Sequence, residues 1–134
     1  MKKTALLMLL AVAFAGCDET EIAKLKGSYS GTFIYHNPSD AAAPKSGPVT
    51  VTFDGTTYSS TRNPDYIPAG GSGTFEFSDK KTVKFEDQNF WTANFDWNLI
   101  LKGEYDYEIK GDSLIITRSR DEVKLYEYRL KRDQ

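Results

Sequence analysis

The sequence predicts an all-β domain, most simply an antiparallel up-and-down barrel of about eight to nine strands, and two observations carry this prediction. Aromatic residues make up 13% of the chain, with eight Tyr, eight Phe and two Trp, and such residues are enriched in strands. From Leu25 onward, apolar and polar residues alternate with a period of two, and turn residues interrupt the alternation at short intervals. That pattern is typical of half-buried strands joined by tight connections.

The first half of the domain reads as a succession of short strands. Tyr29, Phe33 and Tyr35 share one face of a first strand, with Ser and Thr residues between them on the other. Residues 49–53 repeat the alternation, and Asp54-Gly55 follows as a dipeptide that favours a two-residue hairpin turn. Further strands are expected over 56–62, 75–77 and 83–85, with a turn at 78–81.

The C-terminal third shows the clearest alternation. Trp97, Leu99 and Leu101 continue in phase into the apolar positions of 105–109, which predicts either one bent strand or two strands joined at Gly103. Turns are expected at 110–112 and 120–122, with strands over 113–119 and 123–131.

Strands this close in sequence must pair antiparallel, because a parallel return needs a crossover of roughly a dozen residues. Their apolar face must be covered, and without helices the sheet has to close on itself or fold into two layers. A barrel also removes the exposed strand edges. A β-sandwich is the alternative, since alternation alone does not separate the two.

Residues 1–16 read as a signal peptide, with Lys2 and Lys3 before an apolar run from Ala5 to Ala15. The run is too short for a membrane span, which needs about 20 residues. Phe14-Ala15-Gly16-Cys17 resembles the lipobox of bacterial lipoproteins. The resemblance implies that Cys17 becomes a lipidated N-terminus, with a thioether diacylglycerol and an amine acylated by a chain such as palmitate. Two or three acyl chains make such an attachment durable.

Three segments follow from this interpretation: the signal peptide (1–16), the lipidated cysteine with an acidic tether (17–24), and the folded domain (25–134). The expected location is the bacterial cell envelope, anchored to the outer membrane on its periplasmic or surface face, with the inner membrane as the alternative. The acids directly after Cys17 are either a sorting signal or a solvated spacer.

The folded domain resembles the small lipocalin-like lipoproteins of Gram-negative bacteria. The resemblance is carried by Lys-Gly-x-Tyr-x-Gly over 26–31, Gly-x-Tyr-x-Tyr over 103–107 and Gly-Asp-Ser-Leu over 111–114. It implies a barrel with one open mouth, but it does not identify a ligand, because a fold does not fix a function.

Charge and motif content argue against several functions. Removal of residues 1–16 leaves 15 of the 17 basic side chains against 19 acidic ones, so no basic face for nucleic acid is expected. His36 is the only histidine, and no recognisable metal-ligand spacing surrounds it. The Ser-x-x-Lys at 78–81 falls in a hairpin turn rather than at a helix start. We therefore expect neither catalysis nor a cofactor or metal.

Two hypotheses for function remain. The first is a membrane-anchored module that binds a small apolar or amphiphilic molecule in the barrel mouth. The second is a protein-interaction module, either an envelope accessory subunit or an enzyme inhibitor, with a filled barrel and contacts made by its loops. Loops 36–48 and 63–73 hold all five prolines and would frame the mouth if they lie at one end. Arg62 and Arg118 both fall at alternating positions that are expected to face the barrel interior. Either could bind an anionic head group or reach out to solvent at the rim. The candidate ligand-binding residues are Tyr35, Tyr58, Arg62, Tyr66, Tyr105, Tyr107, Arg118 and Tyr128.

Overall fold

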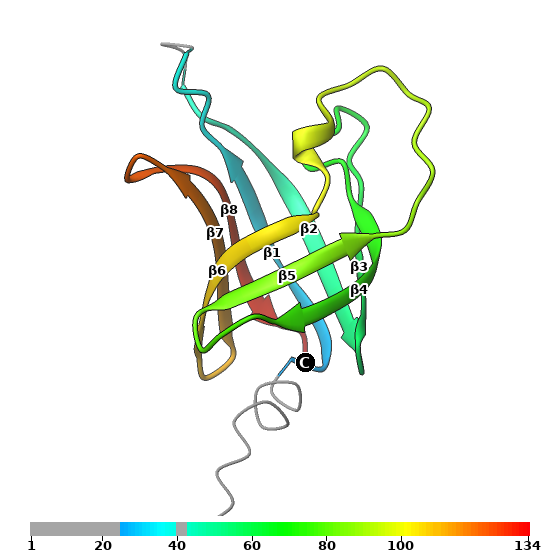
Figure 1. Ribbon diagram of the computed structural model, residues 1–134, viewed down its shortest axis with the longest axis vertical. Coiled ribbons are helices and arrows are strands. Elements are labelled where there is room, and N and C mark those ends of the chain that lie inside the picture. Colours follow the sequence, from blue (N-terminus) through cyan, green and yellow to red (C-terminus); the bar gives the residue numbers. More distant parts are fainter. Residues whose placement is uncertain (1–24, 40–42) are drawn as a thin grey trace, which may run out of the picture.

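The computed structural model describes residues 25–39 and 43–134, and this part of the chain is a closed eight-stranded barrel (Figure 1). Each strand pairs antiparallel with the next one in sequence, and the last pairs with the first. This confirms the predicted up-and-down barrel over the sandwich. The predicted signal peptide, Cys17 and the acidic tether lie outside the described residues. The strands are β1 (Gly27–Tyr35), β2 (Lys45–Asp54), β3 (Thr57–Ser60), β4 (Gly71–Phe77), β5 (Thr82–Asp87), β6 (Gly103–Lys110), β7 (Ser113–Arg120) and β8 (Val123–Arg132).

The alternation in sequence becomes the inside and outside of the barrel. In β2, Val49, Val51 and Phe53 are buried, whereas the residues between them are half-buried, because successive side chains of a strand point to opposite faces. Gly55 has φ 61° in the turn between β2 and β3, a conformation that glycine adopts without steric cost. Local turn chemistry and burial therefore specify the same strand register.

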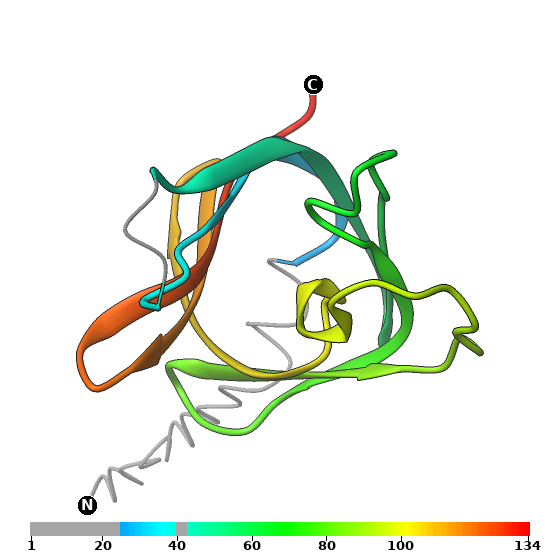
Figure 2. The same ribbon diagram turned by 90° about the horizontal axis from the view of Figure 1, so that it is seen from above.

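The two ends of the barrel differ in the length of their connections (Figures 1 and 2). At the turn end lie the short connections 55–56, 78–81 and 111–112, together with the start of β1 and the end of β8. At the loop end lie the connections 61–70 and 88–102, the described parts of 36–44, and one short turn at 121–122. Both proline-rich loops thus lie at one end, as the mouth hypothesis required.

The prediction that Trp97 continues a strand in phase with Leu99 and Leu101 is wrong. Trp97–Leu99 form a 3₁₀ helix, η1, and β6 begins only at Gly103. The Asp96 carboxylate accepts a hydrogen bond from the backbone N–H of Asn98 at 3.0 Å, which is a local alternative to strand pairing. Gly103 then has φ 85°, so the chain changes direction there before it enters β6.

Other boundaries shift by a few residues. The return strand expected over 56–62 is shorter, because β3 ends at Ser60 and leaves Arg62 outside it. In the other direction, β2 begins at Lys45, so that Pro48 belongs to a strand and lies opposite Thr32 of β1. Within the second proline-rich loop, Tyr66 and Ile67 are half-buried and pack against the core.

Candidate functional site

The barrel interior is filled largely by aromatic rings in contact with one another. The Tyr58 and Phe85 ring centroids are 4.8 Å apart, those of Phe33 and Tyr128 4.7 Å, and those of Phe53 and Phe75 5.1 Å. Edge and tilted arrangements of this kind are the favourable ones for aromatic pairs. Six of these interior rings have less than 2% of their surface exposed: Tyr29, Phe33, Phe53, Phe85, Tyr105 and Tyr128. The interior therefore serves first as the core of the protein.

The last residue of η1 and the two that follow it cover part of the loop end, and η1 lies over the ring of strands when the barrel is seen from above (Figure 2). Leu99, Ile100 and Leu101 are all buried. The backbone N–H of Ala69 donates to Leu99 O at 3.0 Å, and that of Leu101 donates to Gly70 O at 2.9 Å. We call residues 99–101 the cap, because they join two of the long loops across the mouth.

Tyr58 and Arg118, two candidate ligand-binding residues, contact the cap and the chain that leaves it. The Tyr58 hydroxyl donates to Leu101 O at 2.5 Å. Arg118 donates to Lys102 O through Nη2 and to Glu104 O through Nε at 3.2 Å. Burial, with a smaller contribution from Asp87, raises the pKa of Tyr58 well above its usual value. The Tyr58 hydroxyl is therefore protonated near neutral pH and able to act as this donor.

A polar cluster lies among the interior rings around Arg118. Its guanidinium carbon is 4.2 Å from the centroid of the Tyr105 ring and 5.8 Å from that of Tyr126, distances typical of cation–π contacts. Burial raises the pKa of Tyr105 to about 12, although the charge of Arg118 opposes the shift. The fully buried Tyr128 hydroxyl has no hydrogen-bond partner among the described residues. Such a group is rare in folded proteins.

The eight candidate ligand-binding residues do not converge on one site. Four of them lie close together: the Tyr105 ring is 6.1 Å from that of Tyr128 and 4.2 Å from the Arg118 guanidinium carbon, and Phe85 contacts both Tyr105 and Tyr58. The other four divide into separate groups. Tyr35 stacks on Tyr126 at 5.3 Å, Tyr107 contacts Phe77 at 4.8 Å toward the turn end, and Arg62 lies 5.6 Å from the Tyr66 ring in the loops.

The loops carry an aromatic surface that sequence reasoning missed. Tyr66 stacks on Phe95 with ring centroids 4.4 Å apart, and Phe95 also contacts Trp91 at 5.5 Å and Trp97 at 6.4 Å. We call Tyr66, Trp91, Phe95 and Trp97 the loop-end aromatic cluster. On the same loop, Phe90 is 92% exposed. The available signal was the run QNFWTANFDWN over 88–98, which alternates aromatic with amide and hydroxyl side chains and fits neither a strand nor a helix period.

A hollow of about 290 Å³ lies beside this cluster, where β3 and β4 meet the loops. Asp87 fixes one wall of it: its carboxylate accepts from Trp91 Nε1 at 2.5 Å, from Asn89 Nδ2 at 2.7 Å and from the backbone N–H of Ser72 at 3.0 Å. The lining comprises Ser59, Ser60, Arg62, Ala69, Gly70, Gly71, Ser72, Asn89 and Trp91.

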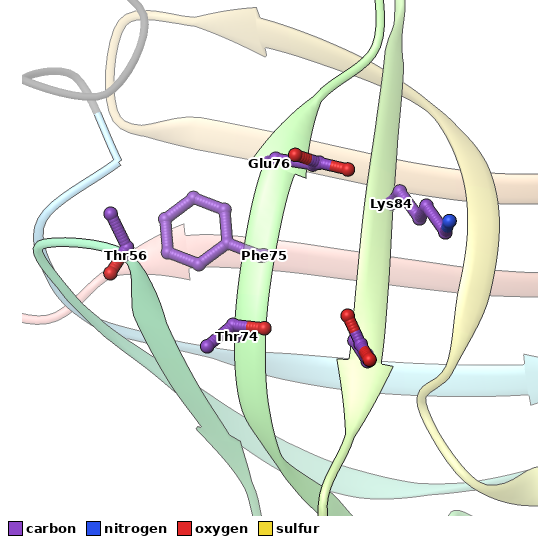
Figure 3. A pocket seen from close by; sticks show the side chains of 6 residues that line it. Thr56, Thr74, Phe75, Glu76 and Lys84 are labelled. Atoms are coloured by element: carbon purple, nitrogen blue, oxygen red, sulfur yellow. The ribbon is translucent and has the colours of Figure 1, made fainter.

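A second hollow, of about 240 Å³, lies on the side of the barrel and is shown in Figure 3. Its charged groups come from facing strands, since Glu76 of β4 lies opposite Lys84 of β5, and Glu86 lies opposite Thr74. Its single cation is therefore next to acidic neighbours, and its one aromatic residue is the buried core residue Phe75. The hollow beside Trp91 has the wider range of hydrogen-bonding groups, with hydroxyls, an amide, an indole and a guanidinium.

Comparisons with known proteins leave the family open: no protein-family model matches the chain, and no curated protein is significantly similar to it in sequence. No helix within the described ranges is long and apolar enough to cross a membrane. Among those same residues, no cluster of three or more His, Cys, Asp or Glu side chains could hold a metal ion.

Proposed function

We propose that this protein is a lipid-anchored, non-enzymatic module of the bacterial envelope that recognises a partner protein through its loop end. Attachment through Cys17 rests on the resemblance of residues 14–17 to a lipobox. The closed barrel would act as a support for the loops at its loop end.

The observation that carries this proposal is the contrast between a ring-filled interior and an exposed aromatic loop. Phe90 is 92% exposed and Trp97 is 47% exposed, whereas the interior rings are almost fully buried. Exposed apolar side chains that gather in one patch are typical of contact surfaces, and Phe90 and Trp97 belong to one loop that also carries Trp91 and Phe95. Trp, Tyr and Arg supply a disproportionate share of binding energy in protein interfaces, and Arg62 lies over Tyr66 at the edge of this surface.

The composition of the loop supports a protein partner over a purely apolar one. Asn89, Thr92 and Asn94 are exposed between the aromatic residues. Aromatic anchors interspersed with short amide and hydroxyl side chains are characteristic of adaptable protein-binding loops. A lipid bilayer would offer few hydrogen-bond partners to these amides.

The position of the loops relative to the expected anchor also supports the proposal. The described chain enters β1 at the turn end, and the loop 88–102 lies at the opposite end of the barrel (Figure 1). A tether from Cys17 would therefore hold the turn end toward its own membrane. The loop-end aromatic cluster would then face away from the anchor, toward other envelope proteins.

The proposal is tested by affinity capture with a matched pair of variants. The soluble Cys17→Ser protein would be immobilised and exposed to detergent-solubilised envelope, and any retained protein would be identified, purified and titrated directly. We expect Phe90→Ser to weaken binding about tenfold or more, because exposed aromatic anchors contribute on the order of 1–2 kcal/mol or more. Glu76→Gln, in the hollow on the side of the barrel, should leave affinity unchanged. Equal affinity of the Phe90→Ser and parent proteins would contradict the proposal.

A small amphiphilic ligand in the barrel mouth is the second candidate, and the Tyr128 hydroxyl favours it. That hydroxyl is fully buried without a partner among the described residues, so a bound polar head group could supply one. Native mass spectrometry of the membrane-extracted protein, with Cys17→Ser as its soluble counterpart, would distinguish the candidates. A small molecule that co-purifies repeatedly with both would favour the mouth, and a mature N-terminus without acyl mass would overturn the anchor.

A further inference from the structure

The hollow beside Trp91 has one aromatic wall that is already fixed in place. Trp91 is half-buried, and its indole N–H donates to Asp87 Oδ2 at 2.5 Å. The other oxygen of Asp87 accepts from Asn89 and from the backbone N–H of Ser72, which ties the loop to β4. A ligand that stacks on this ring would not have to order it first, and such preorganisation favours affinity.

Hydrogen-bonding groups surround that wall. The residues that line the hollow include Ser59, Ser60 and Ser72, which carry hydroxyls, and Asn89, which carries an amide. The Ser72 hydroxyl already contacts Asn89, with a 2.9 Å separation between Oγ and Nδ2. Ser60 Oγ is different: it is buried, and the described part of the chain offers it no hydrogen-bond partner. Less than 1 Å² of this atom is exposed, so in this conformation it does not reach a ligand in the hollow, and the available polar groups are those of Ser72 and Asn89.

Arg62 supplies a charge at the edge of the hollow. Its guanidinium lies 5.6 Å from the Tyr66 ring centroid, and no carboxylate of residues 25–39 or 43–134 forms a salt bridge with it. An arginine fork binds planar carboxylates and phosphates through two parallel hydrogen bonds. Since the cation–π contact occupies only the face of the guanidinium, its N–H groups remain available at the edge.

From these groups we infer that the hollow beside Trp91 binds a saccharide that carries a carboxylate or phosphate. A sugar ring combines an apolar C–H face, which can stack on an indole, with a rim of hydroxyls that match Ser72 and Asn89. Arg62 would take the anionic substituent. The volume of about 290 Å³ lies at the lower end of small-molecule sites, which suits one or two sugar rings. This site shares Trp91 and Arg62 with the edge of the surface proposed for a partner protein, but it does not require Phe90, so the two proposals can fail separately.

The hollow of Figure 3 provides an internal control. It is similar in volume, at about 240 Å³, but its cation Lys84 lies opposite Glu76. It also lacks an indole or an amide in its lining. We therefore expect it not to distinguish anionic from neutral sugars.

The test uses two sugars that differ only in an acidic substituent: N-acetylmuramic acid, which carries a lactyl carboxylate, and N-acetylglucosamine, which does not. The Cys17→Ser protein with Trp97→Phe retains Trp91 as its only tryptophan, so its fluorescence reports on the hollow. We expect saturable binding of N-acetylmuramic acid and at least tenfold weaker binding of N-acetylglucosamine. Arg62→Gln should reduce the first affinity to the level of the second, because a charge-assisted bidentate contact is lost.

Controls separate this result from loss of folding and from the partner contact. Lys84→Gln and Phe90→Ser should both leave N-acetylmuramic acid binding unchanged, and Arg62→Gln should retain the thermal midpoint of the parent, since its side chain is exposed. Failure of Phe90→Ser to lose its protein partner would overturn the proposed function but not the saccharide site. An unchanged Trp91 signal up to tens of millimolar sugar, equal affinity for the two sugars, or full binding by Arg62→Gln would each overturn the saccharide site.

Discussion

The connections at the turn end and at the loop end of the barrel are stabilised by different interactions. At the turn end, connections of two to four residues close the strands with little more than local backbone chemistry, and Leu25 is fully buried where the described chain begins. At the loop end, two long connections pack on each other through aromatic stacking, carbonyl hydrogen bonds and the cap. The strands therefore supply stability, while the side chains available for recognition lie at the loop end.

The largest expected effect comes from a matched pair of phenylalanines, one in each environment. Phe85 is 1% exposed and contacts the rings of Phe53, Tyr58 and Tyr105, whereas Phe90 lies in solvent. Phe85→Ala should lower the free energy of unfolding by about 3–5 kcal/mol, through lost burial and a residual cavity. Phe90→Ala should change it by no more than about 0.5 kcal/mol. Urea denaturation monitored by circular dichroism checks both. Similar losses of stability in the two variants would contradict the distinction between a stabilising interior and an exposed loop.

Alkaline pH should destabilise the interior selectively. Burial raises the pKa of Tyr105 from 10.0 to about 12, and raises those of Tyr58, Tyr126 and Tyr128 in the same direction. The folded state holds these protons more tightly than the unfolded state, so the stabilisation is complete below pH 10 and is lost as pH rises toward 12. For Tyr105 alone the slope should be about 1 kcal/mol per pH unit. Urea midpoints measured from pH 8 to pH 12 test this, and a flat profile above pH 10 would contradict it.

Removal of the Tyr58 hydroxyl should loosen the cap. Tyr58→Phe deletes the hydrogen bond to Leu101 O and leaves a buried carbonyl without this donor, at a cost of roughly 1–3 kcal/mol. Hydrogen exchange at Leu101, whose N–H is bonded to Gly70 O, should accelerate more than exchange in β1 or β8. Uniform acceleration across the barrel would instead indicate that Tyr58 contributes only to global stability.

The smallest expected effect concerns the Tyr128 hydroxyl. In the absence of a ligand, Tyr128→Phe should leave stability unchanged or raise it by up to about 1 kcal/mol, because it removes a buried polar atom that no described residue satisfies. The thermal midpoints of the variant and the parent, compared with those of Tyr58→Phe, measure the difference. A marked loss of stability would show that this hydroxyl is already paired within the protein, and would remove the reason to place a polar head group beside it.

The sequence predicted the barrel well, because strand formation here is decided by neighbouring residues. The alternation of Val49, Val51 and Phe53 and the turn at Gly55 specify β2 and its return without reference to distant parts of the chain. The prediction failed at Trp97, where the local hydrogen bond from Asn98 to Asp96 outweighs an alternation that continues in phase.

The candidate site was less predictable, because its contacts join residues distant in sequence. The alternation predicts that Arg118 faces the barrel interior, but it does not reveal that its hydrogen-bond partners are the carbonyl oxygens of Lys102 and Glu104. The stacking of Tyr66 on Phe95 likewise depends on how two loops meet at the loop end. Sequence reasoning therefore identified Tyr66 as a loop residue but missed Phe90, Trp91 and Phe95.

Site-specific photo-crosslinking in cells tests the central claim most directly, namely that recognition belongs to the loop end. A photoreactive phenylalanine would replace Phe90 in one strain and Glu76, an exposed residue toward the turn end, in another. The account predicts a discrete protein adduct from position 90, absent from position 76 and retained when the interior variant Tyr128→Phe is combined with it. Equal adducts from both positions, or none from position 90 in a protein that is correctly anchored, would contradict it.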